Sequence, residues 1–183
     1  KSQDDTDPCE RPVVAHADQL MIVTALADPE PRPGIIDRLL VAAFDAGIHP
    51  ILCLTKADLA SPDHLIASYG PLGIDIVVTL PGADLTQVHR VLHNHVTVLV
   101  GHSGVGKSTL INALIPGTDR AIGHVNVVTG KGRQTSTSAI ALELPGGGWA
   151  IDTPGVRSFG LSHVRPASSL GAFPDLANLS LLH

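Results

Sequence analysis

The chain has 183 residues, of which 44% are hydrophobic and only 3% aromatic, and its formal net charge is −5. This length fits one domain with a sizeable aliphatic core, and the acidic balance argues against strong nucleic-acid binding by this chain alone. Two cysteines are too few for a disulfide framework or a cysteine zinc site, and no apolar stretch approaches the roughly 18 residues of a membrane span. We therefore expect a globular protein of the reducing cytoplasm.

Strands and helices are predicted to alternate in the first half of the chain. Residues 1–12 are polar, which predicts a linker or the remnant of an absent upstream domain. Apolar, β-branched runs predict strands and amphipathic spacing predicts helices. The predicted strands cover 19–25, 50–54 and 74–79, and the predicted helices cover 35–46, 62–69 and 85–93. Such alternation is typical of a parallel α/β sheet.

A phosphate-binding loop is predicted at Gly101–Ser108, where GHSGVGKS matches the pattern GxxxxGK[ST]. An apolar run, VTVLV at 96–100, precedes the loop, and helical spacing over 107–114 follows it. Lys107 would reach the β and γ phosphate oxygens and Ser108 would ligate magnesium, while glycines let the backbone amides converge on the phosphates. A glycine-rich turn that binds nothing is the alternative, but such a turn needs neither the Lys nor the Ser. The nucleotide-binding residues predicted here are Gly101, His102, Ser103, Gly104, Val105, Gly106, Lys107, Ser108 and Thr109.

A second motif, TKAD at 55–58, stands before the phosphate loop in the chain. Asp58 can accept hydrogen bonds from N1 and the 2-amino group of guanine, whereas adenine offers neither donor there. Lys56 can lay its aliphatic stem along the base, and Thr55 can support the loop. Alone, this tetrapeptide reads more often as a solvated turn, but beside a phosphate loop it predicts guanine recognition. Val78 and Thr79, at the end of the next strand, would touch the base edge through the backbone.

The second half of the chain adds a polar stretch and a third motif. Residues 116–138 show no buried periodicity, whereas 140–144 and 149–152 predict a hairpin. The sequence DTPG follows, in which Asp152 would hold magnesium through a water and the Gly155 amide would sense the γ phosphate. A simple strand-to-turn role is the alternative for this motif. Thr137 or Thr135, within GRQTSTS, would complete the magnesium shell.

The order TKAD, GHSGVGKS, GRQTST, DTPG resembles the circularly permuted GTPases, and most closely the ribosome small subunit-dependent GTPase A (RsgA) family. ADQLMIV near the start and DTPGVRSFGL at 152–161 add to this resemblance, which covers roughly residues 13–161. The resemblance implies a three-layer P-loop NTPase fold with a mostly parallel six-stranded sheet. Five strands would be parallel and one antiparallel, with the usual connection between the third and fourth strands cut.

The same resemblance implies a cytoplasmic, monomeric enzyme that hydrolyses GTP to GDP and phosphate with magnesium. It would act late in small ribosomal subunit assembly, with turnover stimulated by that subunit. Family members carry an upstream OB-fold and a downstream zinc-binding domain that help to contact rRNA. We expect neither here: residues 162–183 read as a C-terminal tail without cysteine, so zinc is not supported.

Three positions depart from the family or from related GTPases. Thr55 stands where the family usually has Asn, and Val156 stands where Ras-like enzymes have a water-orienting Gln. Gln134 replaces the His to which water activation is attributed, so the predicted catalytic residues are Lys107 and Gln134. His89 and His93 are expected on a solvated helix face rather than at a metal.

Two other functions compete with the GTPase hypothesis. One is a nucleotide-gated rRNA-binding checkpoint module whose hydrolysis is incidental, and the other is an ATPase or small-molecule kinase that shares only the phosphate loop.

Overall fold

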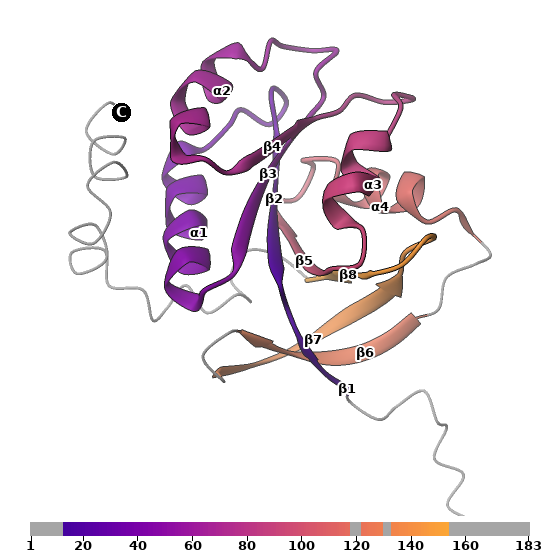
Figure 1. The fold of residues 1–183 in the computed structure, drawn as a ribbon. Helices are drawn as coiled ribbons and strands as arrows, with labels where there is room; N and C mark the ends of the chain where they lie inside the picture. The colour runs from indigo at the N-terminus through magenta and orange to yellow at the C-terminus, as the bar shows by residue number, and fades with distance from the viewer. Residues whose placement is uncertain (1–12, 118–121, 130–132, 154–183) are drawn as a thin grey trace, which may run out of the picture.

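The computed structural model describes residues 13–117, 122–129 and 133–153, and these form one mixed sheet flanked by helices (Figure 1). The strands are β1 (Val13–His16), β2 (Gln19–Ala25), β3 (His49–Thr55), β4 (Asp75–Val78), β5 (Val96–Gly101), β6 (Ile122–Thr129), β7 (Arg133–Glu143) and β8 (Trp149–Asp152). The helices are α1 (Pro33–Ala46), α2 (Asp63–Tyr69), α3 (Thr86–Leu92) and α4 (Lys107–Leu114), with a short 3-10 turn, η2 (Gly70–Leu72). The described strands are ordered β1-β6-β7-β8-β5-β2-β3-β4.

The six strands expected from the sequence form one continuous part of this sheet. Strands β8, β5, β2, β3 and β4 are parallel neighbours, and β7 pairs with β8 in the antiparallel sense. The expectation of five parallel strands and one antiparallel strand is therefore confirmed. The α/β fold class and the predicted helices are confirmed as well.

The sequence did not predict two further strands. Strand β6 lies in the stretch 116–138, to which no element was assigned, and it pairs with β7 in the antiparallel sense. Strand β7 begins at Arg133 rather than near residue 140, and β1 pairs with β6. These residues show no buried apolar period, but β6 and this part of β7 are rich in Val and Thr, whose branched Cβ favours an extended backbone.

Helices cover both faces of the parallel strands. In Figure 1, α1 and α2 lie on one side of β2, β3 and β4, whereas α3 and α4 lie on the other. The side chains of β2 alternate accordingly: Leu20 and Ile22 join the core beneath α1, and Met21 and Val23 join the core beneath α4. Each face thus buries its own aliphatic cluster, as a three-layer fold requires.

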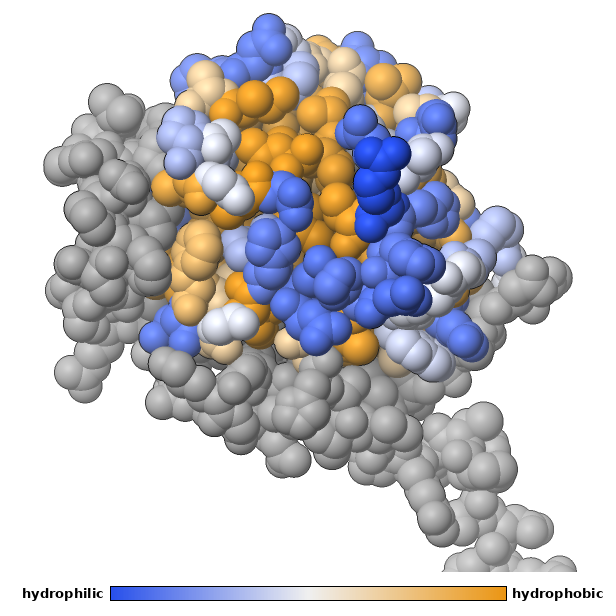
Figure 2. Space-filling view, viewed as in Figure 1, coloured by the Kyte–Doolittle hydropathy of each residue, from blue (hydrophilic) through white to orange (hydrophobic). Residues whose placement is uncertain are grey.

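Strand β4 forms one edge of the sheet and faces the viewer between the two helix layers. Figure 2 shows an apolar surface in this region. Val78 at the end of β4 is 39% exposed, and Leu80 just beyond it is 43% exposed. The connections that follow β2, β3 and β5, and Thr153 directly after β8, lie at the carboxyl ends of parallel strands, the edge at which open α/β sheets bind ligands.

Candidate functional site

The loop between β5 and α4 takes a backbone path that requires glycine. Gly104 and Gly106 have φ of +83° and +91°, in the left-handed region. A Cβ at Gly101 would lie 2.9 Å from the carbonyl oxygen of Val23, so the strand and the loop approach too closely for any side chain. The backbone geometry therefore requires glycine at each of these three positions of GHSGVGKS.

Lys107, the first residue of α4, contacts the end of β8. Its Nζ donates a hydrogen bond of 2.5 Å to the Thr153 carbonyl oxygen and lies 2.8 Å from Asp152 Oδ1. Thr153 is held in turn, because its hydroxyl donates to the Leu99 carbonyl oxygen at 2.9 Å. The fold thus brings two motifs together that are more than 40 residues apart. Ser108 follows Lys107 in the first turn of α4 and is exposed.

The TKAD loop is anchored to the phosphate loop through Thr55. Thr55 is buried, and its hydroxyl is within hydrogen-bond reach of the carbonyl oxygens of Val105 and Thr24. Lys56 has a φ of +59°, and its Nζ donates to the carbonyl oxygen of Asp28, in the loop after β2. Strands β2, β3 and β5 therefore end in three loops that are tied to one another.

A cleft of about 290 Å³ lies between the TKAD loop and the phosphate loop. Thr55, Thr79 and Gly106 line it, together with a wall that the sequence did not predict, made of Leu80, Pro81, Gly82, Ala83 and Leu85. Pro81 and Gly82 indicate a turn directly after β4, and this turn could have predicted a wall of the cleft at that end of the strand. The volume is near the lower end of small-molecule pockets, about 300–1,000 Å³.

Two residues of the predicted base-binding set lie outside the walls of this cleft. Asp58 is exposed in the TKAD loop, and Val78 is exposed at the end of β4. Thr79 lies on the wall, and its amide donates to the Leu54 carbonyl oxygen at 2.8 Å while its carbonyl oxygen accepts from Ala57 at 3.2 Å. The peptide groups at Thr79 are thus held by the strand that leads into TKAD.

The predicted switch residues are not brought to Asp152 in this conformation. Ile140 of β7 is the backbone partner of Asp152. Thr137 and Gln134 precede Ile140 by three and six residues. In an extended strand their Cα atoms therefore lie roughly 10 Å and roughly 20 Å from that of Ile140. Gly155, like Val156, falls outside the described residues.

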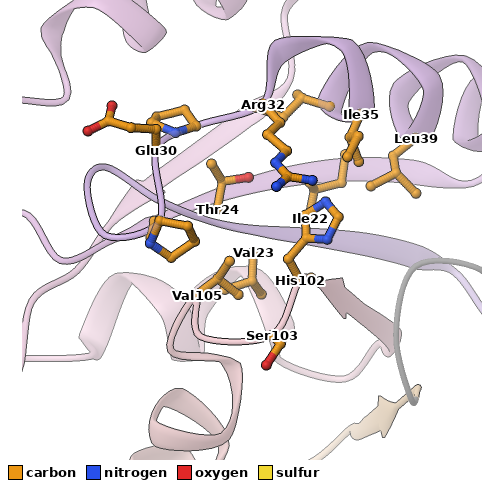
Figure 3. A pocket seen from close by; sticks show the side chains of 15 residues that line it. Ile22, Val23, Thr24, Glu30, Arg32, Ile35, Leu39, His102, Ser103 and Val105 are labelled. Atoms are coloured by element: carbon orange, nitrogen blue, oxygen red, sulfur yellow. The ribbon is translucent and has the colours of Figure 1, made fainter.

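His102 faces away from Ser103 and occupies a second cavity, on the α1 side of the phosphate loop. Figure 3 shows its ring beside the Arg32 guanidinium, while Ser103 points in the opposite direction. We call this cavity the rear pocket; it is lined by the start of α1, the end of β2 and residues 101–105, and its volume is about 230 Å³. Desolvation, and then the charge of Arg32, lower the pKa of His102.

Other side chains singled out by the sequence offer little chemistry. Burial raises the pKa of the Cys53 thiol to about 12, which leaves it protonated and unreactive. Within the described ranges, no three His, Cys, Asp or Glu residues are grouped so that they could hold a metal ion. No helix in the described part of the chain is long and apolar enough to cross a membrane.

Comparison with known protein families shows to which family the chain belongs. The family described as RsgA GTPase matches residues 1–162. The chain belongs to the RsgA GTPase family. Its chain order agrees with this assignment, because the TKAD loop after β3 precedes the phosphate loop after β5, as in a circularly permuted GTPase.

Curated RsgA relatives and solved structures support the assignment. The small ribosomal subunit biogenesis GTPase RsgA of Azotobacter vinelandii is 45% identical over 92% of this chain and 51% of its own length. The protein of the same name from Pseudomonas aeruginosa strain LESB58 is 46% identical over 84% of this chain and 48% of its own length.

Two solved structures share the fold. YjeQ from Thermotoga maritima is 31% identical with a TM-score of 0.60, covering 76% of this chain and 48% of that one. YloQ, a circularly permuted GTPase, is 26% identical with a TM-score of 0.62, covering 88% of this chain and 53% of that one. The chain thus spans about half the length of the RsgA relatives that it matches.

Proposed function

We propose that this chain binds GTP and hydrolyses it to GDP and phosphate, as the nucleotide-handling part of a protein that acts in late small ribosomal subunit assembly. The contact of Lys107 with both Asp152 and Thr153 carries the proposal. It joins a phosphate-binding loop to the DTPG motif at the carboxyl ends of parallel strands. On nucleotide binding, Lys107 would exchange these two partners for β and γ phosphate oxygens.

Magnesium fits the residues at this end of α4. The Asp152 carboxylate lies beside the phosphate loop, with Oδ1 2.8 Å from Lys107 Nζ, and Ser108 is the next residue of the helix. Hydroxyl and carboxylate oxygens are donors that magnesium prefers, so Ser108 would ligate the ion directly and Asp152 through a water. A bound ion would neutralise charge that develops on the phosphate oxygens.

Guanine would enter the cleft between the TKAD and phosphate loops. Asp58 would swing onto the base edge and accept its N1 and 2-amino protons, which selects guanine over adenine. Thr79 would contribute backbone contacts from the wall, and Val78 from the end of β4. Thr55 would position the site from beneath, through its contact with Val105.

Hydrolysis requires a rearrangement at the start of β7. Gln134 would orient the attacking water, and Thr137 would complete the magnesium shell, but both lie far along the strand from Asp152. Residues 133–138 must therefore turn back over the phosphates, while Gly155 would sense the γ phosphate. We expect slow turnover without a partner, because reaching this state costs free energy that a partner can supply.

The partner that we propose is the small ribosomal subunit with its rRNA, and the proposed location is the cytoplasm. Both follow from family membership, since the relatives are named for small ribosomal subunit biogenesis. Residues 13–161 would form the GTPase domain and function as a monomer, with residues 1–12 and 162–183 as flanking segments.

Stimulation by the ribosomal subunit tests this function most directly. GTP hydrolysis by the full-length protein is measured with and without purified small subunits, using large subunits as the control. We expect strong stimulation by small subunits alone. Equal rates in all three conditions would contradict the proposal, and GTP-dependent binding to the small subunit without hydrolysis would favour a checkpoint module instead.

A further inference from the structure

The rear pocket is separate from the proposed nucleotide site but shares the phosphate loop with it. Residues 101–105 form one wall, whereas the cleft beside TKAD uses Gly106 and the helix after it. The opposite wall is the first part of α1, and the floor is the end of β2 (Figure 3). One loop therefore has two faces, a front that meets Lys107 and a back that meets α1.

The inner part of the rear pocket is aliphatic. Ile22, Ile36 and Leu39 line it, and each of these residues is at most 2% exposed, so they form a fixed surface continuous with the core beneath α1. Val105 closes the side toward the phosphate loop. A ligand that fills this part must therefore present a compact, branched or linear hydrocarbon body.

The outer part of the rear pocket carries two polar side chains, Arg32 and His102. Arg32 makes no ion pair with any described residue, and Figure 3 shows its guanidinium directed over His102, while the Glu30 carboxylate points away from the cavity. His102 Nε2 is buried and has no hydrogen-bond partner within the described ranges. A guanidinium matches a carboxylate with two parallel hydrogen bonds, and a neutral imidazole can donate one more.

We infer that the rear pocket binds a small amphipathic carboxylate, with its hydrocarbon body against Ile22, Ile36 and Leu39 and its carboxylate against Arg32 and His102. The pocket volume of about 230 Å³ limits the ligand to a short aliphatic acid.

Occupancy of the rear pocket couples to the nucleotide site through the phosphate loop. Gly101 touches Val23, and the Val105 carbonyl oxygen accepts from Thr55, so the loop cannot shift at the back without moving contacts at the front. A carboxylate also cancels positive charge close to the phosphates. The bound acid therefore weakens nucleotide affinity, and by linkage the nucleotide weakens binding of the acid by the same factor. Only this coupling rests on the proposed function.

Binding is tested with 4-methylpentanoate, titrated into the full-length protein and followed by the NMR signals of the His102 ring. We expect saturable binding with a dissociation constant on the order of 1 mM, which suits a ligand this small. The pKa of His102 should rise on binding, because the incoming negative charge favours the protonated ring. The uncharged isostere 4-methylpentanamide should bind at least tenfold more weakly.

Arg32→Gln is the decisive variant, and Arg38→Gln is its matched control. Both arginines are exposed and belong to the α1 region, but only Arg32 lines the pocket. We expect at least tenfold weaker binding in Arg32→Gln and unchanged binding in Arg38→Gln, with melting temperatures of both variants close to that of the wild type. Equal affinity in Arg32→Gln, equal affinity for the amide, or no saturable shift of His102 would each overturn the proposal.

The coupling between acid binding and nucleotide affinity is measured separately, so a result against the coupling differs from a result against the binding site. GDP affinity is determined with and without saturating 4-methylpentanoate, and we expect a several-fold loss that Arg32→Gln abolishes. Unchanged GDP affinity, with the acid bound at His102, would overturn the coupling while leaving the binding site established. Absence of any nucleotide binding would count against the proposed function, whereas acid binding would still be read from the His102 signals.

Discussion

The two faces of the phosphate loop differ in how completely their charges are satisfied. At the front, Lys107 is paired with Asp152 and bonded to the Thr153 carbonyl oxygen. At the back, Arg32 has no ionic partner among the described residues. The front therefore keeps its cation in place with partners that phosphate oxygens can replace. At the back, the described residues supply no counterion for Arg32.

This difference follows from how each face is assembled. The front is built from short motifs, so the local sequence fixes both the charged group and the backbone that presents it. The back is assembled from the loop before α1, the end of β2 and one side chain of the phosphate loop, which only the folded sheet brings together. The following variants probe the front, the link between the two faces and the back.

Lys107→Ala is expected to have the largest effect, because it removes the front cation. The loss in kcat/KM for GTP should be about 100- to 1,000-fold, as for other preorganised groups that stabilise charge in a transition state. Steady-state hydrolysis, with and without small subunits, measures it. The exposed variant Arg38→Gln serves as the control and should keep wild-type rates. Full activity in Lys107→Ala would place the phosphate site elsewhere.

Asp58→Ala should mainly change which nucleotide the front accepts. Loss of the carboxylate removes the acceptor for the N1 and 2-amino protons of guanine, so the preference for GTP over ATP should fall by about 100-fold or more. Competition binding of the two nucleotides measures this ratio. Asp63→Ala, at the exposed start of α2, is a suitable control. A preference that survives Asp58→Ala would contradict the role of Asp58 in base recognition.

Much of the front was predictable from the sequence, because its signals are local. The strand, the loop glycines and the helix are adjacent in the chain. Strand β5 and helix α4 form as expected and Gly104 and Gly106 take a left-handed φ, whereas Gly101 ends β5 and is required by the close approach of Val23 rather than by its φ. The parallel strands were also predictable, since β2, β3 and β5 are mostly apolar and buried on both faces.

The rest depended on contacts between distant segments. Strand β6 is defined by its ladder with β7 rather than by an apolar period, so its local residue pattern was too weak to predict it. The partners of Lys107 and the rear pocket likewise arise from pairing of β5 with β8 and β2. The roles of Gln134 and Thr137 stay predictions, because the strand that carries them runs past Asp152.

Thr55→Val tests the link between the TKAD loop and the back of the phosphate loop. The substitution preserves shape but removes the hydroxyl that reaches the Val105 carbonyl oxygen. Leaving this buried acceptor unpaired should cost about 2 kcal/mol of unfolding free energy and lower GDP affinity several-fold. Chemical denaturation and calorimetry measure the two quantities. Thr55→Ser keeps the hydroxyl and should recover most of both, whereas equal losses in the two variants would point to packing instead.

Tyr69→Phe is expected to have the smallest effect, and it is confined to the α1 layer behind the pocket. The Tyr69 hydroxyl donates to Asp37 Oδ1 at 2.8 Å, and burial together with this bond raises the Tyr69 pKa. Removing the hydroxyl should cost about 1 kcal/mol, a fall of roughly 2–4 °C in Tm for a domain of this size. GDP affinity should stay unchanged, because neither residue reaches the phosphate loop. Calorimetry measures both the GDP affinity and the Tm. A loss of GDP affinity in this variant would show that a change in α1 reaches the front of the phosphate loop, so that the two faces are not independent.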